Sequence, residues 1–251
     1  MELSLTLTIL ISILFLIVAF LYASVGHGGA SGYLAVLSLF AFQPKEMATT
    51  ALLLNILVAG IAFSTYYRAG YFTLRLTMPF ILSSIPMAFI GGMIDVSTTI
   101  YSILLAVALL FAAYRLTITI EQVKTNTTIA SLNTSVALPV GGVIGLLSGI
   151  VGVGGGIFLS PLMLLMKWAD PKQTSATSAC FIVLNSIAGL LGRHFEQNFS
   201  SGNFLPFVLT AAIGGFFGSR YGTRRFSNLV LRRLLGIVLL IAVIKLLVSA
   251  L

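Results

Sequence analysis

The sequence predicts an all-α integral membrane protein of about ten transmembrane helices. Three observations predict this class: 58% of the 251 residues are hydrophobic, only 8% are charged, and the mean hydropathy is +1.09. A soluble domain of this size would need far more charge on its surface. The apolar residues also fall into blocks of roughly 15 to 22 residues, near the ~20 that a helix needs to cross a bilayer.

Charged residues and Gly or Pro punctuation separate the apolar segments. The first follows residues 1–8, which hold no Lys or Arg, so we expect a retained helix and not a cleaved signal peptide. The second and seventh are short for a crossing, which is typical of tilted half-helices or re-entrant hairpins. In chain order, the expected segments are 4–24, 29–42, 47–67, 72–92, 98–117, 132–150, 155–168, 174–192, 203–220 and 228–248.

The distribution of Lys and Arg favours ten crossings with both termini on the extracytoplasmic side. Ten crossings place three of the 14 cations, Lys45, Arg193 and Lys245, on one face and the remaining 11 on the other. If the two short segments turned back, the division would be 8 against 6, counted from the same 14 residues. The positive-inside rule favours the uneven division, with the cation-rich face in the cytoplasm.

The two halves of the chain resemble each other. Val25–Ala30 matches Val151–Gly156 at a spacing of 126 residues, counted as 151 minus 25. Similar features follow in the same order, with Pro44-Lys45-Glu46 matching Pro171-Lys172-Gln173 and Asn55 matching Asn185. A repeated order of this kind indicates an internal duplication.

The duplication divides the chain into residues 1–117, a polar cytoplasmic linker at 118–131, and residues 132–251. Each repeat holds five expected crossings, and an odd number makes the second repeat enter the membrane from the opposite side. The sequence therefore predicts two inverted-topology five-helix repeats, an arrangement that many secondary transporters share.

A glycine-rich stretch follows the first helix of each repeat and precedes a short segment. Such a stretch interrupts a helix and leaves backbone N–H groups unpaired at membrane depth. The helix that starts after it directs its positive dipole end to the same region, so an anion could bind there without a buried cation. The alternative is that these glycines only allow close helix packing. The residues are Gly26, Gly28 and Gly29 in the first repeat and Gly152, Gly154, Gly155 and Gly156 in the second.

Polar side chains near the glycine stretches are further candidates for substrate binding. The hydroxyl groups could instead cap helices, and a buried Asn could simply bridge two helices. The candidates are Ser31, Thr49, Thr50, Asn55, Thr177, Ser178 and Asn185.

His27 is the one ionisable residue within either glycine stretch. Imidazole titrates near neutral pH, which suits a proton-coupled step. The alternative is a neutral histidine that makes a structural hydrogen bond, and Val153 occupies the matching position in the second repeat.

Gly152–Gly156, followed by Phe158, Pro161 and Ala176-Thr177-Ser178, is similar to the motif order of the TauE/SafE sulfite-exporter family (TSUP membrane transporters). Gly26–Gly32 is a degenerate first copy, with Ala30 in place of the third glycine. The resemblance spans nearly the whole chain. It implies a transporter of sulfite, sulfonates such as sulfoacetate, or related small organic anions in a bacterial inner membrane.

We therefore expect a secondary transporter that works by alternating access around a small anion at the bilayer midplane. A cation or metal transporter or channel is one alternative, although such pathways usually need acidic or sulfur ligands within the membrane. An intramembrane serine protease with Ser31 and a distant His194 is another. We expect no enzyme activity, cofactor, metal site or nucleic-acid partner, and the sequence leaves a homodimer open.

Overall fold

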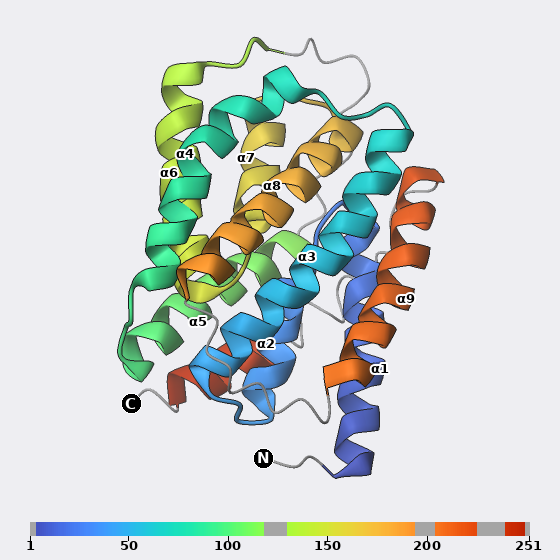
Figure 1. Cartoon of the computed structure of the whole chain (residues 1–251), viewed down its shortest axis with the longest axis vertical. Coiled ribbons are helices and arrows are strands. Elements are labelled where there is room, and N and C mark those ends of the chain that lie inside the picture. The colour runs from blue at the N-terminus through green and yellow to red at the C-terminus, as the bar shows by residue number, and fades with distance from the viewer. Residues whose placement is uncertain (1–3, 118–129, 194–203, 225–238, 249–251) are drawn as a thin grey trace.

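The computed structural model describes residues 4–117, 130–193, 204–224 and 239–248, and all regular structure in these ranges is helical (Figure 1). The expected linker at 118–131 and the first part of the expected segment 228–248 lie mostly outside the described residues. The helices are α1 (Leu5–Ala23), α2 (Ala30–Leu39), α3 (Pro44–Arg68), α4 (Leu74–Met93), α5 (Thr98–Thr117), α6 (Thr134–Val151), α7 (Gly156–Leu165), α8 (Pro171–Gly192), α9 (Phe204–Arg224) and a further apolar helix at Leu239–Val248.

Five helices in the described part of the chain, α1, α3, α4, α6 and α8, are long and apolar enough to cross a membrane. By contrast, α2 and α7 have 10 residues each. At 1.5 Å per residue such a helix is about 15 Å long, half of a hydrocarbon core of ~30 Å. The short helices expected after the two glycine stretches are therefore present, and they are shorter than segments 29–42 and 155–168.

Many large apolar side chains point outward, including Leu5, Val107 and Val143 at 77%, 61% and 61% exposure. The interior instead holds small polar groups, among them Thr77, Thr177 and Asn185. An apolar exterior around a partly polar interior is suited to lipid as the solvent.

Two long helices begin at a proline, three residues earlier than the sequence predicts. Pro44 opens α3 and Pro171 opens α8, because proline needs no backbone donor in the first helical turn. Asp170 caps α8 by accepting hydrogen bonds from the amides of Lys172 and Gln173 at 2.8 and 2.9 Å. Thr49, Thr50, Thr177 and Ser178 therefore lie inside helices, so the capping alternative for them is wrong.

Glycines spaced by four residues bring two pairs of helices into close backbone contact. A Cβ atom added at any of these glycines would overlap the backbone of the neighbouring helix. The facing residues advance in the same order along both helices, so each pair runs parallel, and small residues at this spacing are the usual means of close packing in membranes. The contacts are Gly141, Gly145 and Gly149 of α6 on Phe80, Ser84 and Ala88 of α4, and Gly214, Gly218 and Gly222 of α9 on Leu16, Phe20 and Ser24 of α1.

α3 and α8 pack against each other in the middle of the bundle, where they lie side by side between the two glycine-packed pairs (Figure 1). α8 also packs on α4, and α3 packs on α9. The half-helices follow the same pattern, with α2 packing on α3 and α7 on α8. The paired central helices therefore support both glycine stretches.

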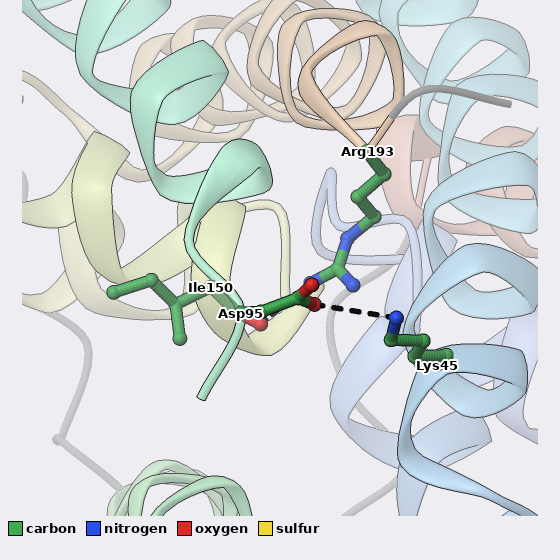
Figure 2. Close-up of polar contacts among 4 residues, drawn as sticks. All are labelled: Lys45, Asp95, Ile150 and Arg193. Atoms are coloured by element: carbon green, nitrogen blue, oxygen red, sulfur yellow. Dashed lines mark hydrogen bonds and ion pairs between the residues drawn. The ribbon is translucent and has the colours of Figure 1, made fainter. Parts of the chain in front are cut away.

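Cationic side chains at one end of the bundle bind the carbonyl ends of helices. Figure 2 shows Arg193, at the end of α8, directed at the last turn of α6, where its guanidinium donates to the carbonyl oxygens of Gly149 and Ile150 at 2.7 and 2.5 Å. Asp95 lies beside Arg193 and forms an ion pair of 3.4 Å with Lys45. A cation near a helix C-terminus opposes the negative end of the helix dipole.

Lys245 makes a similar contact at the end of α2. Its ammonium group donates to the carbonyl oxygens of Ser38 and Leu39 at 2.8 and 2.6 Å. At the opposite end of the bundle, Lys172 donates to the Tyr71 hydroxyl at 2.9 Å and to the Thr223 carbonyl at 3.2 Å.

Candidate functional site

Both glycine stretches interrupt the helical path. Five glycines adopt positive φ angles: Gly26 (+76°), Gly29 (+97°), Gly152 (+84°), Gly154 (+78°) and Gly155 (+79°). This backbone conformation is unfavourable for residues with a side chain and breaks an α-helix. We call residues 24–29 the first break and residues 152–155 the second break.

The two breaks meet inside the protein, 126 residues apart in the chain. Asn55 of α3 bridges them: its Oδ1 accepts a hydrogen bond from the Ala30 amide at 3.1 Å, and its Nδ2 donates to the Val153 carbonyl at 3.2 Å. His27, in the first break, lies 3.2 Å from the Gly156 carbonyl at the start of α7. The starts of α2 and α7 are therefore held close together.

Each break also packs on the long helix that supports the other one. A Cβ atom at Gly26 would lie 2.6 Å from Ser175 Cβ in α8, and one at Gly152 would lie 2.8 Å from Ala48 Cα in α3. The close-packing interpretation of the glycines therefore applies to Gly26 and Gly152. Close packing does not explain why the backbone amides of the residues that follow these glycines lack hydrogen-bond acceptors.

Several buried amides in the two breaks and in the first turns of α2 and α7 have no hydrogen-bond acceptor among the described residues. Five such groups follow one another in the second break and the first turn of α7, and four lie at the first break and the start of α2. More than nine in ten buried backbone N–H groups in proteins are paired, so such a concentration is unusual. The groups belong to Val153, Gly154, Gly155, Gly156 and Ile157, and to Gly28, Gly29, Ser31 and Gly32.

Three carbonyl groups of the same region lie close to side-chain nitrogens. Asn55 donates to Val153, and the His27 ring nitrogens lie 2.9 Å from the Val25 carbonyl and 3.2 Å from the Gly156 carbonyl. At Val153 and Gly156 the carbonyl end of the peptide group thus faces a side-chain nitrogen, while the amide end, at Gly154 and Ile157, has no acceptor among the described residues. This arrangement creates a positive potential without a charged side chain, which suits an anion.

A short chain of polar side chains extends from His27 into the second repeat. The Ser160 hydroxyl of α7 lies 3.0 Å from His27 Nε2 and 2.7 Å from the Ser178 hydroxyl of α8. Ser160 was missed by the sequence analysis because Leu34 occupies its matching position in the first repeat. Its place between Phe158 and Pro161 of the family motif was the available signal.

The remaining residues predicted for the site make separate contacts or lie outside the described residues. The Ser31 hydroxyl is bonded to the Tyr22 hydroxyl at 2.7 Å, and Thr177 accepts from Thr77 of α4 at 3.3 Å. Thr50 is buried and Thr49 is half-buried. His194, the base expected for a protease, lies outside the described residues.

The expected match between Asn55 and Asn185 does not hold in space. A Cβ at Gly28 would touch Asn55 of its own repeat; one at the matching Gly154 would also touch Asn55, and the nearest atom that it would meet in its own repeat is Ile182 Cγ2 at 3.0 Å, not Asn185. Gly26 contacts Ser175 of α8, and its counterpart Gly152 contacts Ala48 of α3, so Ala48 and Ser175 are matching positions. Matching residues of α3 and α8 are therefore 127 residues apart in the sequence, counted as 175 minus 48. Asn55 therefore corresponds to Ile182, and Asn185 lies almost one turn further along α8.

A family model described as sulfite exporter TauE/SafE matches residues 11–246. The chain belongs to the TauE/SafE family. It is 35% identical over 241 residues to the probable membrane transporter protein y4hK of Sinorhizobium fredii, covering 94% of this chain and 97% of that protein. It is also 30% identical over 114 residues to the probable membrane transporter protein YunE of Bacillus subtilis, covering 44% and 40%. No solved structure matches the chain.

Membership identifies this TauE/SafE protein as a membrane transporter and not an enzyme. The protease alternative is therefore wrong, and the Ser31 hydroxyl is bonded to the Tyr22 hydroxyl.

Proposed function

We propose that this TauE/SafE protein is a secondary transporter of a small sulfur-containing anion, sulfite or an organosulfonate such as sulfoacetate, across the bacterial inner membrane. The observation that carries the proposal is the set of unpaired amides at the two breaks. Amide donors favour an anion over the cation that the sequence left open, because a cation needs oxygen or sulfur ligands. The family description, which names sulfite, supports the substrate class.

The architecture that suits this function is ten crossings in two inverted repeats, 1–117 and 132–251, joined by a cytoplasmic linker at 118–131. The parallel packing of α1 on α9 and of α6 on α4 supports it, because the first helix of each repeat pairs with the fourth helix of the other. Lys45, Arg193 and Lys245 make their contacts at one end of the bundle, which supports the proposal that this end faces the extracytoplasmic side.

Alternating access would move the two repeats around the anion. Between the breaks, the described polar contacts are side-chain hydrogen bonds from Asn55 and His27, which can break and re-form as the repeats rock. The anion would bind amides from both breaks and so couple the position of one repeat to the other. The hydroxyls of Thr50, Thr177 and Ser178 would line the path.

Proton coupling through His27 is part of the proposal. A neutral imidazole has one N–H donor, whereas two carbonyl acceptors face its two nitrogens. Protonation would satisfy both and place a positive charge beside the first turn of α7, where it would strengthen anion binding. The neutral ring would instead accept from Ser160 and release the Gly156 carbonyl.

Transport by purified protein in liposomes tests the proposed function. Gly155→Ala adds a Cβ at a φ of +79°, where it would lie 2.7 Å from Ile144 Cγ2 and 2.8 Å from Phe181 Cε1. The backbone must shift, which moves the unpaired amides, and we expect sulfite uptake to fall at least about tenfold. Gly60→Ala is the control, because its Cβ meets nothing within 4 Å, and it should transport normally. Normal uptake by an intact Gly155→Ala protein would reject the site.

A further inference from the structure

Three buried side-chain atoms beside the second break have no hydrogen-bond partner in the described part of the chain: Ser148 Oγ, Asn185 Oδ1 and Ser186 Oγ. All three residues are 0% exposed. An unpaired buried polar atom is costly and uncommon, so three at one place indicate that a partner binds there.

Ser148 and Ser186 lie beside glycines of the second break, and Asn185 lies on the face of α8 that packs against them. A Cβ at Gly154 would lie 3.1 Å from Ser186 Oγ, and a Cβ at Gly155 would lie 3.5 Å from Ser148 Cβ. Asn185 follows Phe181 and Ile182 by four and three residues, so it lies on the same face of α8. That face is the one that contacts Gly154, Gly155 and Gly156.

The chemistry of the Asn185 amide is fixed by its other hydrogen bond. Its Nδ2 donates to the Phe181 carbonyl at 2.8 Å, so the nitrogen cannot exchange places with the oxygen without losing that bond. The unpaired atom is therefore an acceptor only. A purely accepting ligand, such as a fully ionised oxyanion, would leave it unpaired.

Among the described residues, the first break has one such atom beside it, the Tyr33 hydroxyl, which a Cβ at Gly29 would approach to 2.9 Å, but no counterpart of the three. At the repeat spacings of 126 in α6 and 127 in α8, the counterparts of Ser148, Asn185 and Ser186 are Tyr22, Val58 and Ala59. The Tyr22 hydroxyl is bonded to Ser31, and the other two side chains are apolar. The polar subsite therefore belongs to the second repeat alone.

We propose that Ser148, Asn185 and Ser186 form a subsite that accepts a hydrogen bond from an O–H or N–H group of the transported anion. The amides of the second break hold the negative group, and the subsite selects anions that also carry a donor. The subsite rests on the proposed transport function and narrows its substrate class to a small anion with a hydrogen-bond donor close to its charged group, which includes bisulfite and excludes fully ionised anions such as sulfoacetate.

Calorimetric binding to the purified full-length protein tests the subsite with two anion pairs that differ by one hydroxyl group. These are 2-hydroxyethanesulfonate against ethanesulfonate and glycolate against acetate. We expect the hydroxylated member of at least one pair to bind about 3- to 10-fold more tightly, as one added hydrogen bond provides. Ser186→Ala should reduce this preference to below about twofold. Ser12→Ala is the matched control, because Ser12 Oγ is also buried and without a described partner but lies in α1, and it should keep the preference.

Equal binding within both pairs, or a preference that Ser186→Ala leaves unchanged, would overturn the subsite. If anion binding itself persists and Gly155→Ala weakens it, the proposed function stands without the subsite. If no anion of either pair binds the wild-type protein, or Gly155→Ala binds them all normally, both proposals fail. Circular dichroism of each variant separates misfolding from lost binding, and Asn185→Leu, which removes the acceptor, provides a second variant with the same expected loss of preference.

Discussion

Asn55 and His27 show how single side chains join the two halves of the site. Asn55 uses its acceptor on the first break and its donor on the second, and His27 reaches from the first break to α7. His27 was a candidate because it is the one ionisable residue within the glycine stretches, and Asn55 because it is a polar residue in the segment that follows them, with helix bridging as the alternative. Their partners could not be predicted, since they depend on how two distant segments pack.

Replacing His27 tests the proton-coupled step at the residue scale. His27→Gln keeps an amide donor for the Gly156 carbonyl but cannot titrate. Since protonated His27 would add a positive charge beside the anion, wild-type anion affinity should rise several-fold as the pH falls. The affinity of the variant should change little over the same range of pH. Binding titrations at several pH values, with an anion such as ethanesulfonate that stays ionised throughout, measure the difference.

A pH dependence that His27→Gln retains would exclude His27 as the titrating group. Ser160→Ala provides a further control, because it removes the hydroxyl beside Nε2 and leaves the imidazole able to titrate. This variant should keep the rise in affinity at low pH.

At the scale of elements, the sequence predicted where the helices are interrupted, but it did not predict where α3 and α8 begin. Consecutive glycines predicted both breaks and the short helices that follow them. The starts of α3 and α8 were placed too late, because the polar residues after Pro44 and Pro171 resembled a loop. Proline in the first helical turn and the Asp170 cap were the local signals to use.

The glycine rows of α6 and α9 depend on packing that a single sequence does not reveal. Gly142 and Gly145 lie three residues apart in α6, yet a Cβ at Gly145 would overlap the Ser84 backbone, while one at Gly142 would meet only Met87 Cγ at 3.7 Å and Ser83 Cβ at 3.8 Å. Substitution by alanine should therefore affect the stability of the protein differently at Gly142 and at Gly145.

Gly145→Ala should destabilise the protein by about 1–3 kcal/mol, since α4 and α6 must move apart. Gly142→Ala should be neutral or stabilising by about 0.5–1 kcal/mol, because alanine favours the helix. Thermal unfolding in detergent compares the two variants. Equal melting temperatures would show that α4 and α6 are not in the close contact described.

At the scale of the whole molecule, the proposed inverted arrangement assigns a side of the membrane to each loop. Lys45 and Arg68 are exposed at opposite ends of α3, and the charge distribution predicts that these ends face opposite sides of the membrane. In this proposal α2 and α7 are too short to cross as helices, and a break and a half-helix together would return the chain to the first side.

Cysteine accessibility tests the orientation in a Cys180→Ala background, since Cys180 is the one native cysteine. Lys45→Cys should react with a membrane-impermeant maleimide in intact spheroplasts. Arg68→Cys should react only after the membrane is permeabilised. Labelling of both positions from the same side would contradict the assignment of ten crossings.

The proposed transport mechanism depends on the amides at the meeting point of the two breaks that have no acceptor among the described residues. A cryo-electron microscopy map of the protein with bound sulfite or a sulfonate measures this most directly. We predict density for the anion about 2.7–3.1 Å from amide nitrogens of residues 153–157, with α6 and α7 still separate. An anion bound elsewhere in the membrane, with these amides paired to protein groups, would contradict the account.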